Sequence, residues 1–102
     1  MTVDEFRRIR AHVLAHGDRL TWCNMYNCNP HLAFDDFDVF FNPDIGQRNI
    51  NCDPARSGFD VMIIRDQRGA AMYFEVRERG HALEIEDGAE PYIARILAAL
   101  PA

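Results

Sequence analysis

The chain of 102 residues is 48% hydrophobic and 11% aromatic, which predicts a single domain, residues 1–102, with one apolar core. Its formal net charge of −5 argues against direct binding to nucleic acid, and its 11 basic residues are all arginine, which excludes mechanisms that need a lysine nucleophile. No apolar stretch approaches the roughly 20 residues that cross a bilayer, so we expect a cytoplasmic protein that does not enter membranes.

The first predicted element is a helix over residues 3–16. Thr2 and Glu5 have the spacing of a capping box, in which each side chain bonds the backbone N–H of the other residue. Gly17 follows the helix, and we expect it to end the helix in the left-handed conformation. One side of the segment carries Val3, Phe6, Ile9, Arg10, Val13 and Leu14 at helical spacing.

Residues 17–58 predict one or two strands separated by long loops. LTWCNMY, residues 20–26, and FDVFF, residues 37–41, have the composition of strands, but Asn, Pro, Asp and Gly interrupt the segments around them. In the second of these strands, alternation with a period of two predicts two faces. One face carries Phe37, Val39 and Phe41, and the other carries Asp36, Asp38 and Phe40.

Residues 59–86 predict an antiparallel meander of three strands. The strands are FDVMIIR, AAMYFEV and HALEIE, joined by turns at residues 66–69 and 77–80 that each end in glycine. In the last strand, Leu83 and Ile85 alternate with Glu84 and Glu86, so one face of this strand is expected to be apolar and the other acidic.

A second helix is predicted at the end of the chain. Glu90 and Pro91 suit its first turn, and Pro101 ends it. Its apolar stripe consists of Tyr92, Ile93, Ile96, Leu97 and Leu100. The order of elements predicts an α+β fold of two layers, in which an antiparallel sheet of three to five strands has the N-terminal and C-terminal helices packed on one face.

The stretch WCNMYNCNPH, residues 22–31, brings cysteine and histidine close together in the sequence. Thiolate and imidazole are the ligands that structural zinc prefers, so Cys23, Cys28, His31 and Cys52 are candidate zinc ligands. Only the Cys23 to Cys28 spacing resembles that of a zinc site, and free cysteines are commonly small buried hydrophobes. A cysteine paired with a histidine would also make a thiol nucleophile. We expect no cofactor, with zinc as the alternative.

The run FDDFDVFFNPD, residues 34–44, interleaves four acids with four phenylalanines. In an extended strand Phe40 is expected on the exposed side among the acids, where an aromatic anchor within an acidic rim suits a partner with a basic surface. The alternative is a core strand whose acidic edge is only solvated. With the acids of the last strand, the candidate partner-binding residues are Asp35, Asp36, Asp38, Phe40, Asp44, Glu84 and Glu86.

Two functions fit these observations. The first is a small acidic intracellular protein that binds another macromolecule, for example an inhibitor of a basic nucleic-acid-handling protein of the immunity, antitoxin or anti-defence type. The partner would be a protein with a basic surface, and the chain would not be an enzyme. The alternative is a small Cys/His zinc domain or a thiol-dependent enzyme built from residues 22–58.

Overall fold

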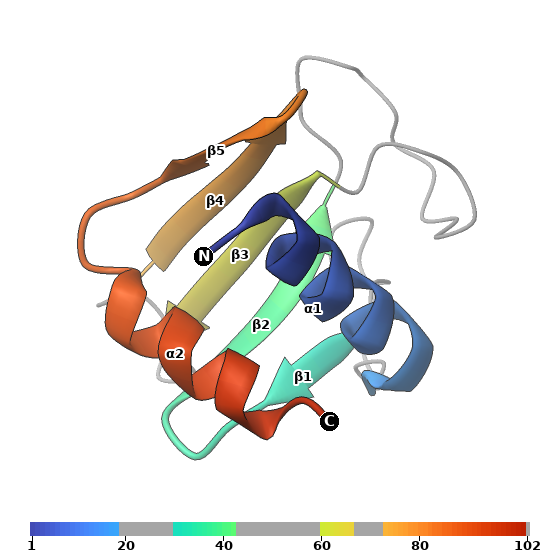
Figure 1. The fold of residues 1–102 in the computed structure, drawn as a ribbon. Coiled ribbons are helices and arrows are strands. Elements are labelled where there is room, and N and C mark those ends of the chain that lie inside the picture. Colours follow the sequence, from blue (N-terminus) through green and yellow to red (C-terminus); the bar gives the residue numbers. More distant parts are fainter. Residues whose placement is uncertain (19–29, 43–59, 67–72, 102) are drawn as a thin grey trace.

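The computed structural model describes residues 1–18, 30–42, 60–66 and 73–101. In these ranges, two helices cover one face of a five-stranded sheet in which every neighbouring pair of strands is antiparallel (Figure 1). The order of the described strands is β1-β2-β3-β4-β5, so β1 and β5 form the two edges of this part of the sheet. This arrangement confirms the predicted α+β fold of two layers. The elements are α1 (Val3–His16), β1 (His31–Ala33), β2 (Phe37–Asn42), β3 (Val61–Asp66), β4 (Tyr73–Arg79), β5 (Ala82–Ile85) and α2 (Glu90–Ala99).

Helix α1 begins at the predicted capping box. The Thr2 backbone N–H donates to Glu5 Oε1 at 2.9 Å, and the Glu5 N–H donates to Thr2 Oγ1 at 3.1 Å. The backbone hydrogen bond from Thr2 lowers the pKa of Glu5. Gly17 ends the helix as predicted, but its φ of −68° shows that the expected left-handed conformation is wrong. Glycine fits there because a Cβ would lie 2.6 Å from Val13 O and 2.8 Å from Pro30 Cβ.

Helix α2 also has the predicted bounds and stripe. Pro91 occupies its first turn, where its missing N–H costs no helical hydrogen bond, and the helix ends before Leu100 and Pro101. Ile93 and Ile96 are buried against the sheet, while Arg95 on the opposite side is exposed. In the described part of the chain no helix is long and apolar enough to span a bilayer.

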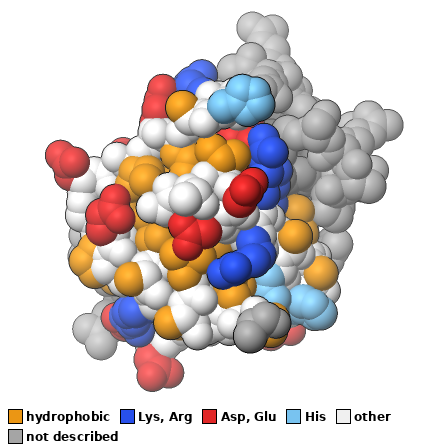
Figure 2. Space-filling model, viewed as in Figure 1, with side chains coloured by type: hydrophobic (Ala, Val, Ile, Leu, Met, Phe, Trp, Pro, Cys, Tyr) orange, Lys and Arg blue, Asp and Glu red, His pale blue; other side chains and the backbone are white. Residues whose placement is uncertain are grey.

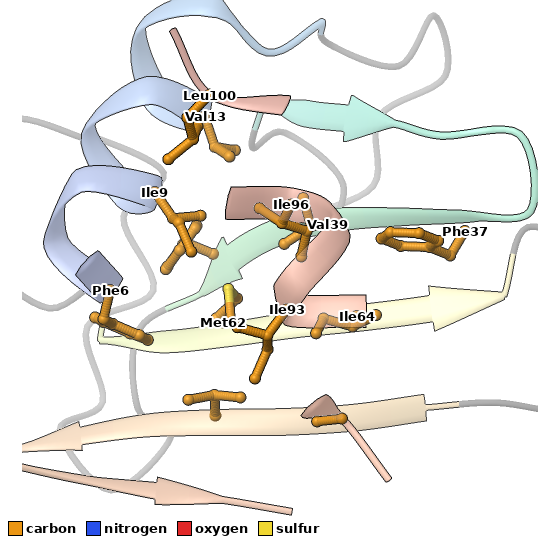
Figure 3. Close-up of a cluster of buried hydrophobic side chains, with 13 residues drawn as sticks. Phe6, Ile9, Val13, Phe37, Val39, Met62, Ile64, Ile93, Ile96 and Leu100 are labelled. Atoms are coloured by element: carbon orange, nitrogen blue, oxygen red, sulfur yellow. The ribbon is translucent and has the colours of Figure 1, made fainter. Parts of the chain in front are cut away.

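The main core lies between the two helices and the sheet (Figure 3). Phe6 of α1 meets Phe41 of β2 edge to face, with ring centroids 5.4 Å apart. The faces of β2 and β3 that carry Phe41 and Ile64 are fully buried, as the predicted alternation requires. The buried members of this core are Phe6, Ile9, Val13, Phe37, Val39, Phe41, Met62, Ile64, Val76, Ala89, Ile93, Ile96 and Leu100.

A second buried cluster lies on the opposite face of the sheet. It contains Phe40, Val61 and Ile63, each 4% exposed. Because Phe40 and Ile63 are cross-strand partners in β2 and β3, these two strands bury side chains on both faces. The prediction that Phe40 stands on an exposed face is therefore wrong.

The second half of the sheet confirms most of the predicted meander. β4 extends to Arg79, which pairs with Ala82, so the turn consists of Gly80 and His81 rather than residues 77–80. Gly80 has the positive φ, +63°, that favours glycine. In the first half of the sheet, β2 coincides with the predicted strand FDVFF, whereas β1 was not predicted. The predicted strand LTWCNMY and most of the predicted turn at residues 66–69 lie outside the described residues.

Candidate functional site

The first candidate site is a buried polar cluster formed by His31, Asp38 and Arg65, which come from the adjacent strands β1, β2 and β3. His31 Nδ1 lies 3.1 Å from Asp38 Oδ2, and Arg65 Nε donates to Asp38 Oδ1 at 3.0 Å. The side chains of His31 and Asp38 are 3% and 9% exposed, whereas that of Arg65 is 31% exposed. The cluster places an acid between two bases.

The surroundings of Asp38 favour its ionised form. Burial raises the pKa of Asp38, but hydrogen bonds from His31 and Arg65, together with the charge of Arg65, lower it further than burial raises it. The net effect holds the pKa of this carboxyl below its ordinary value. Asp38 is therefore a charged, internally bound carboxylate, and its predicted place on an exposed acidic rim is wrong.

Phe40 forms one wall of this cluster. Its ring stacks on the His31 imidazole with centroids 4.3 Å apart, and the Arg65 guanidinium lies 4.9 Å from the Phe40 centroid. A cation over an aromatic face gains electrostatic attraction, and more so where water is excluded. Phe40 thus contributes to holding the buried cluster, and its side chain is not available as a surface anchor.

The second nitrogen of His31 gives this cluster chemical interest. If Nδ1 carries the ring proton and donates a hydrogen bond to Asp38, Nε2 presents a lone pair. Nε2 is buried and has no hydrogen-bond partner in the structure described. A histidine held by a carboxylate in this way is the arrangement that orients metal ligands and general bases.

The predicted zinc site is only partly visible. Of its four residues only His31 is described, because Cys23, Cys28 and Cys52 lie outside the described ranges. Within those ranges no three His, Cys, Asp or Glu side chains are grouped so that they could hold a metal ion. Of the four predicted zinc ligands, the described part of the chain therefore offers His31 alone.

The acids of the 34–44 run are found in different places. Asp36 follows β1 and binds Arg95 of α2 through two hydrogen bonds of 2.8 and 2.9 Å. Asp35 beside it is exposed, and Asp44 lies outside the described residues. On the side of the molecule that carries the helices, acidic and arginine side chains are interspersed (Figure 2). Asp36 is thus partly neutralised by its own chain.

The second candidate site is on β4 and β5, on the face opposite the helices. We call Glu75, Glu84 and Glu86 the β4–β5 acidic surface. These residues line a hollow of about 330 Å³ together with Arg77 and Ile85. Glu84 is 62% exposed. The surface combines carboxylates with an opening to solvent.

The carboxylates of the β4–β5 acidic surface have partners within the sheet. Arg79 Nε lies 3.1 Å from Glu84 Oε1, and Arg77 pairs with Glu75. Glu86 Oε2 accepts a 2.7 Å hydrogen bond from the Glu75 backbone N–H. The lining of the hollow contains three acids and one arginine, so its formal charge is negative.

The structure does not join all the predicted partner-binding residues into one patch. Asp35 and Asp36 follow edge strand β1, whereas Glu84 and Glu86 belong to or follow the opposite edge strand β5. Four spacings between neighbouring strands separate these edges by about 19 Å. Sequence reasoning placed Glu75 on the same exposed face as Glu84 and Glu86 but missed Arg65 as a member of the first site, since its position depends on the register of β2 and β3.

Comparison of the chain with protein-family models, curated proteins and solved structures finds no match in any of the three.

Proposed function

We propose that the protein acts by binding a protein partner with a basic surface, and that the β4–β5 acidic surface makes the contact. An inhibitor of a basic nucleic-acid-handling protein, of the immunity, antitoxin or anti-defence type, is the form that best suits this chemistry. The observation that carries the proposal is the solvent-open hollow lined by Glu75, Glu84 and Glu86 at one edge of the sheet.

The physical basis is electrostatic complementarity. The chain has a formal net charge of −5, so its long-range field attracts cationic partners and speeds their encounter. Glu84 is exposed although it pairs with Arg79, and an arginine from the partner can bind an exposed carboxylate through two parallel hydrogen bonds. A hollow at the sheet edge gives such a side chain a defined position.

The test is a double charge reversal, Glu84→Arg with Glu86→Arg. A pull-down from the native host with mass spectrometry would identify the partner, and calorimetry with that purified partner would give its Kd. We expect the double variant to bind more than about tenfold more weakly, because two attractive contacts become repulsive. The wild-type affinity should also fall as salt rises, since exposed charges are screened.

The matched control is Asp4→Arg with Asp35→Arg, which changes net charge equally at two exposed positions away from this surface. It should bind almost as tightly as the wild type. An equal loss in both variants would show that net charge alone governs binding, and a loss in the control alone would move the contact to the start of α1 or to the β1–β2 turn.

A second candidate function is the Cys/His zinc domain or thiol-dependent enzyme, favoured by the buried Nε2 of His31, which has no hydrogen-bond partner among the described residues. If this nitrogen is a zinc ligand, the purified protein should contain stoichiometric zinc and should unfold on chelation. His31→Ala should then lose the metal, whereas the exposed His81→Ala should retain it. The metal hypothesis would be contradicted if the protein, purified under reducing conditions, contained no zinc.

A further inference from the structure

β5 forms an open edge of the sheet in the part of the chain that the structure describes. Among the described strands it pairs only with β4, and it lies at the outer margin of the sheet (Figure 1). The opposite edge differs, because Asp18 forms a β-bridge with His31 of β1 through two backbone hydrogen bonds of 2.8 Å. A strand edge without a neighbour offers backbone donors and acceptors to another chain.

The register shows which backbone groups of β5 are directed outward. Glu86 N–H donates to Glu75 O, so Glu86 is turned toward β4. Since successive residues of a strand direct their backbone groups to opposite sides, Glu84 is also turned toward β4. The N–H and C=O groups of Leu83 and Ile85 therefore point away from the sheet, two residues apart, which is the spacing that an added strand requires.

The side chains beside this edge form two rows of different chemistry. Leu83 and Ile85 are half-buried on the helix side, where they pack against the main core. Glu84 and Glu86 are exposed on the other side, next to the hollow that Glu75 helps to line. A strand alongside β5 would meet an apolar row on one face and an acidic row on the other.

We propose that β5 receives an extended segment of the partner protein as a sixth strand, in which arginine or lysine alternates with aliphatic residues. This inference rests on the proposed function and specifies how the partner binds. The basic side chains would lie over Glu84 and Glu86, with one entering the hollow, while the aliphatic side chains would extend the apolar row of Leu83 and Ile85.

The charges of β5 argue against a second copy of this chain as the added strand. Two β5 strands paired about a two-fold axis through Glu84 would place Glu84 directly opposite the Glu84 of the other copy, and an axis through Ile85 would place Glu84 opposite Glu86. Like charges opposite each other destabilise a strand pair. A basic segment has the complementary pattern.

The test uses a synthetic peptide of alternating arginine and valine as the probe. Leu83→Pro removes an outward N–H, which an edge strand tolerates, and Leu83→Ala removes the side chain but keeps that N–H. We expect calorimetry to show that Leu83→Pro binds the peptide about tenfold more weakly than Leu83→Ala, because a backbone hydrogen bond to the peptide is lost. Circular dichroism would confirm that both variants are folded.

A second arm needs no variant of the protein. The same peptide, N-methylated at alternate residues to block the backbone groups facing β5, keeps its charge and should bind the wild type at least about tenfold more weakly. Equal binding of the two peptides, or no binding of the unmodified peptide, would overturn strand addition.

The proposed function is tested separately from the addition of a sixth strand. If N-methylation has no effect but Glu84→Arg with Glu86→Arg weakens binding of the identified partner, the acidic surface binds through charge alone and only the inference of a sixth strand fails. If the charge reversal also leaves binding of that partner unchanged, the proposed function fails as well.

Discussion

Phe41→Ala is expected to lower the free energy of unfolding by about 3–5 kcal/mol, as measured by urea denaturation. Phe41 is fully buried in β2, and its ring meets Phe6 of α1 edge to face. Removing the ring leaves a cavity between the helix and the sheet, and the rigid strand pair β2–β3 can collapse into it only in part. The loss therefore includes both the transfer of apolar surface and the cost of the cavity.

Phe34→Ala is the matched control for this prediction. Phe34 stacks on Phe37 with centroids 4.5 Å apart, but it is only half-buried, so solvent can fill part of the space its ring leaves. A smaller destabilisation is expected. If Phe34→Ala cost as much as Phe41→Ala, Phe41 would not hold α1 to the sheet as the geometry indicates.

Asp38→Ala is expected to cost about 2–4 kcal/mol, because it leaves His31 Nδ1 and Arg65 without their shared carboxylate. The cost should fall short of that for a fully buried pair, since the side chain of Arg65 is 31% exposed and can recover some hydration. Asp36→Ala is the control: it also removes a carboxylate bound to an arginine, but on the exposed surface, and should change the unfolding free energy little.

The stability contributed by Asp38 should also depend on pH. Because the pKa of Asp38 is lower in the folded protein than the value of about 3.9 expected in the unfolded chain, the contribution is fully present above that value. It is lost as the pH falls below about 4 and through the folded pKa. Urea denaturation between pH 2 and 7 should thus show a steeper acid loss for the wild type than for Asp38→Ala; parallel curves would contradict this role.

The helices and the alternating strands were predictable because their signals are local. Thr2 and Glu5 mark the start of α1 within four residues of sequence, and Pro91 and Pro101 mark the ends of α2. Glu84 likewise alternates with apolar neighbours along β5. Each of these patterns depends on residues close in the chain, so neither strand order nor loop placement was needed to interpret it.

The burial of Phe40 and the His31–Asp38–Arg65 cluster depend on contacts between strands. One sequence signal was available. The unbroken apolar run from Val61 to Ile64 is typical of a strand buried on both faces, and β2, which pairs with this run, is buried on both faces as well. The three residues of β1 are too few to show a period. His31 was singled out for its neighbouring cysteines, whereas its observed partner is an acid on the next strand.

The Asp18–His31 bridge at β1 limits how an assembly could grow. Fibrils and open polymers need each subunit to present two complementary edges, so that every added molecule creates a new docking position. In the described portion of this sheet, the bridge occupies backbone groups at one margin while β5 remains accessible at the other. Capture of one segment at β5 would then end in a closed complex of one-to-one stoichiometry.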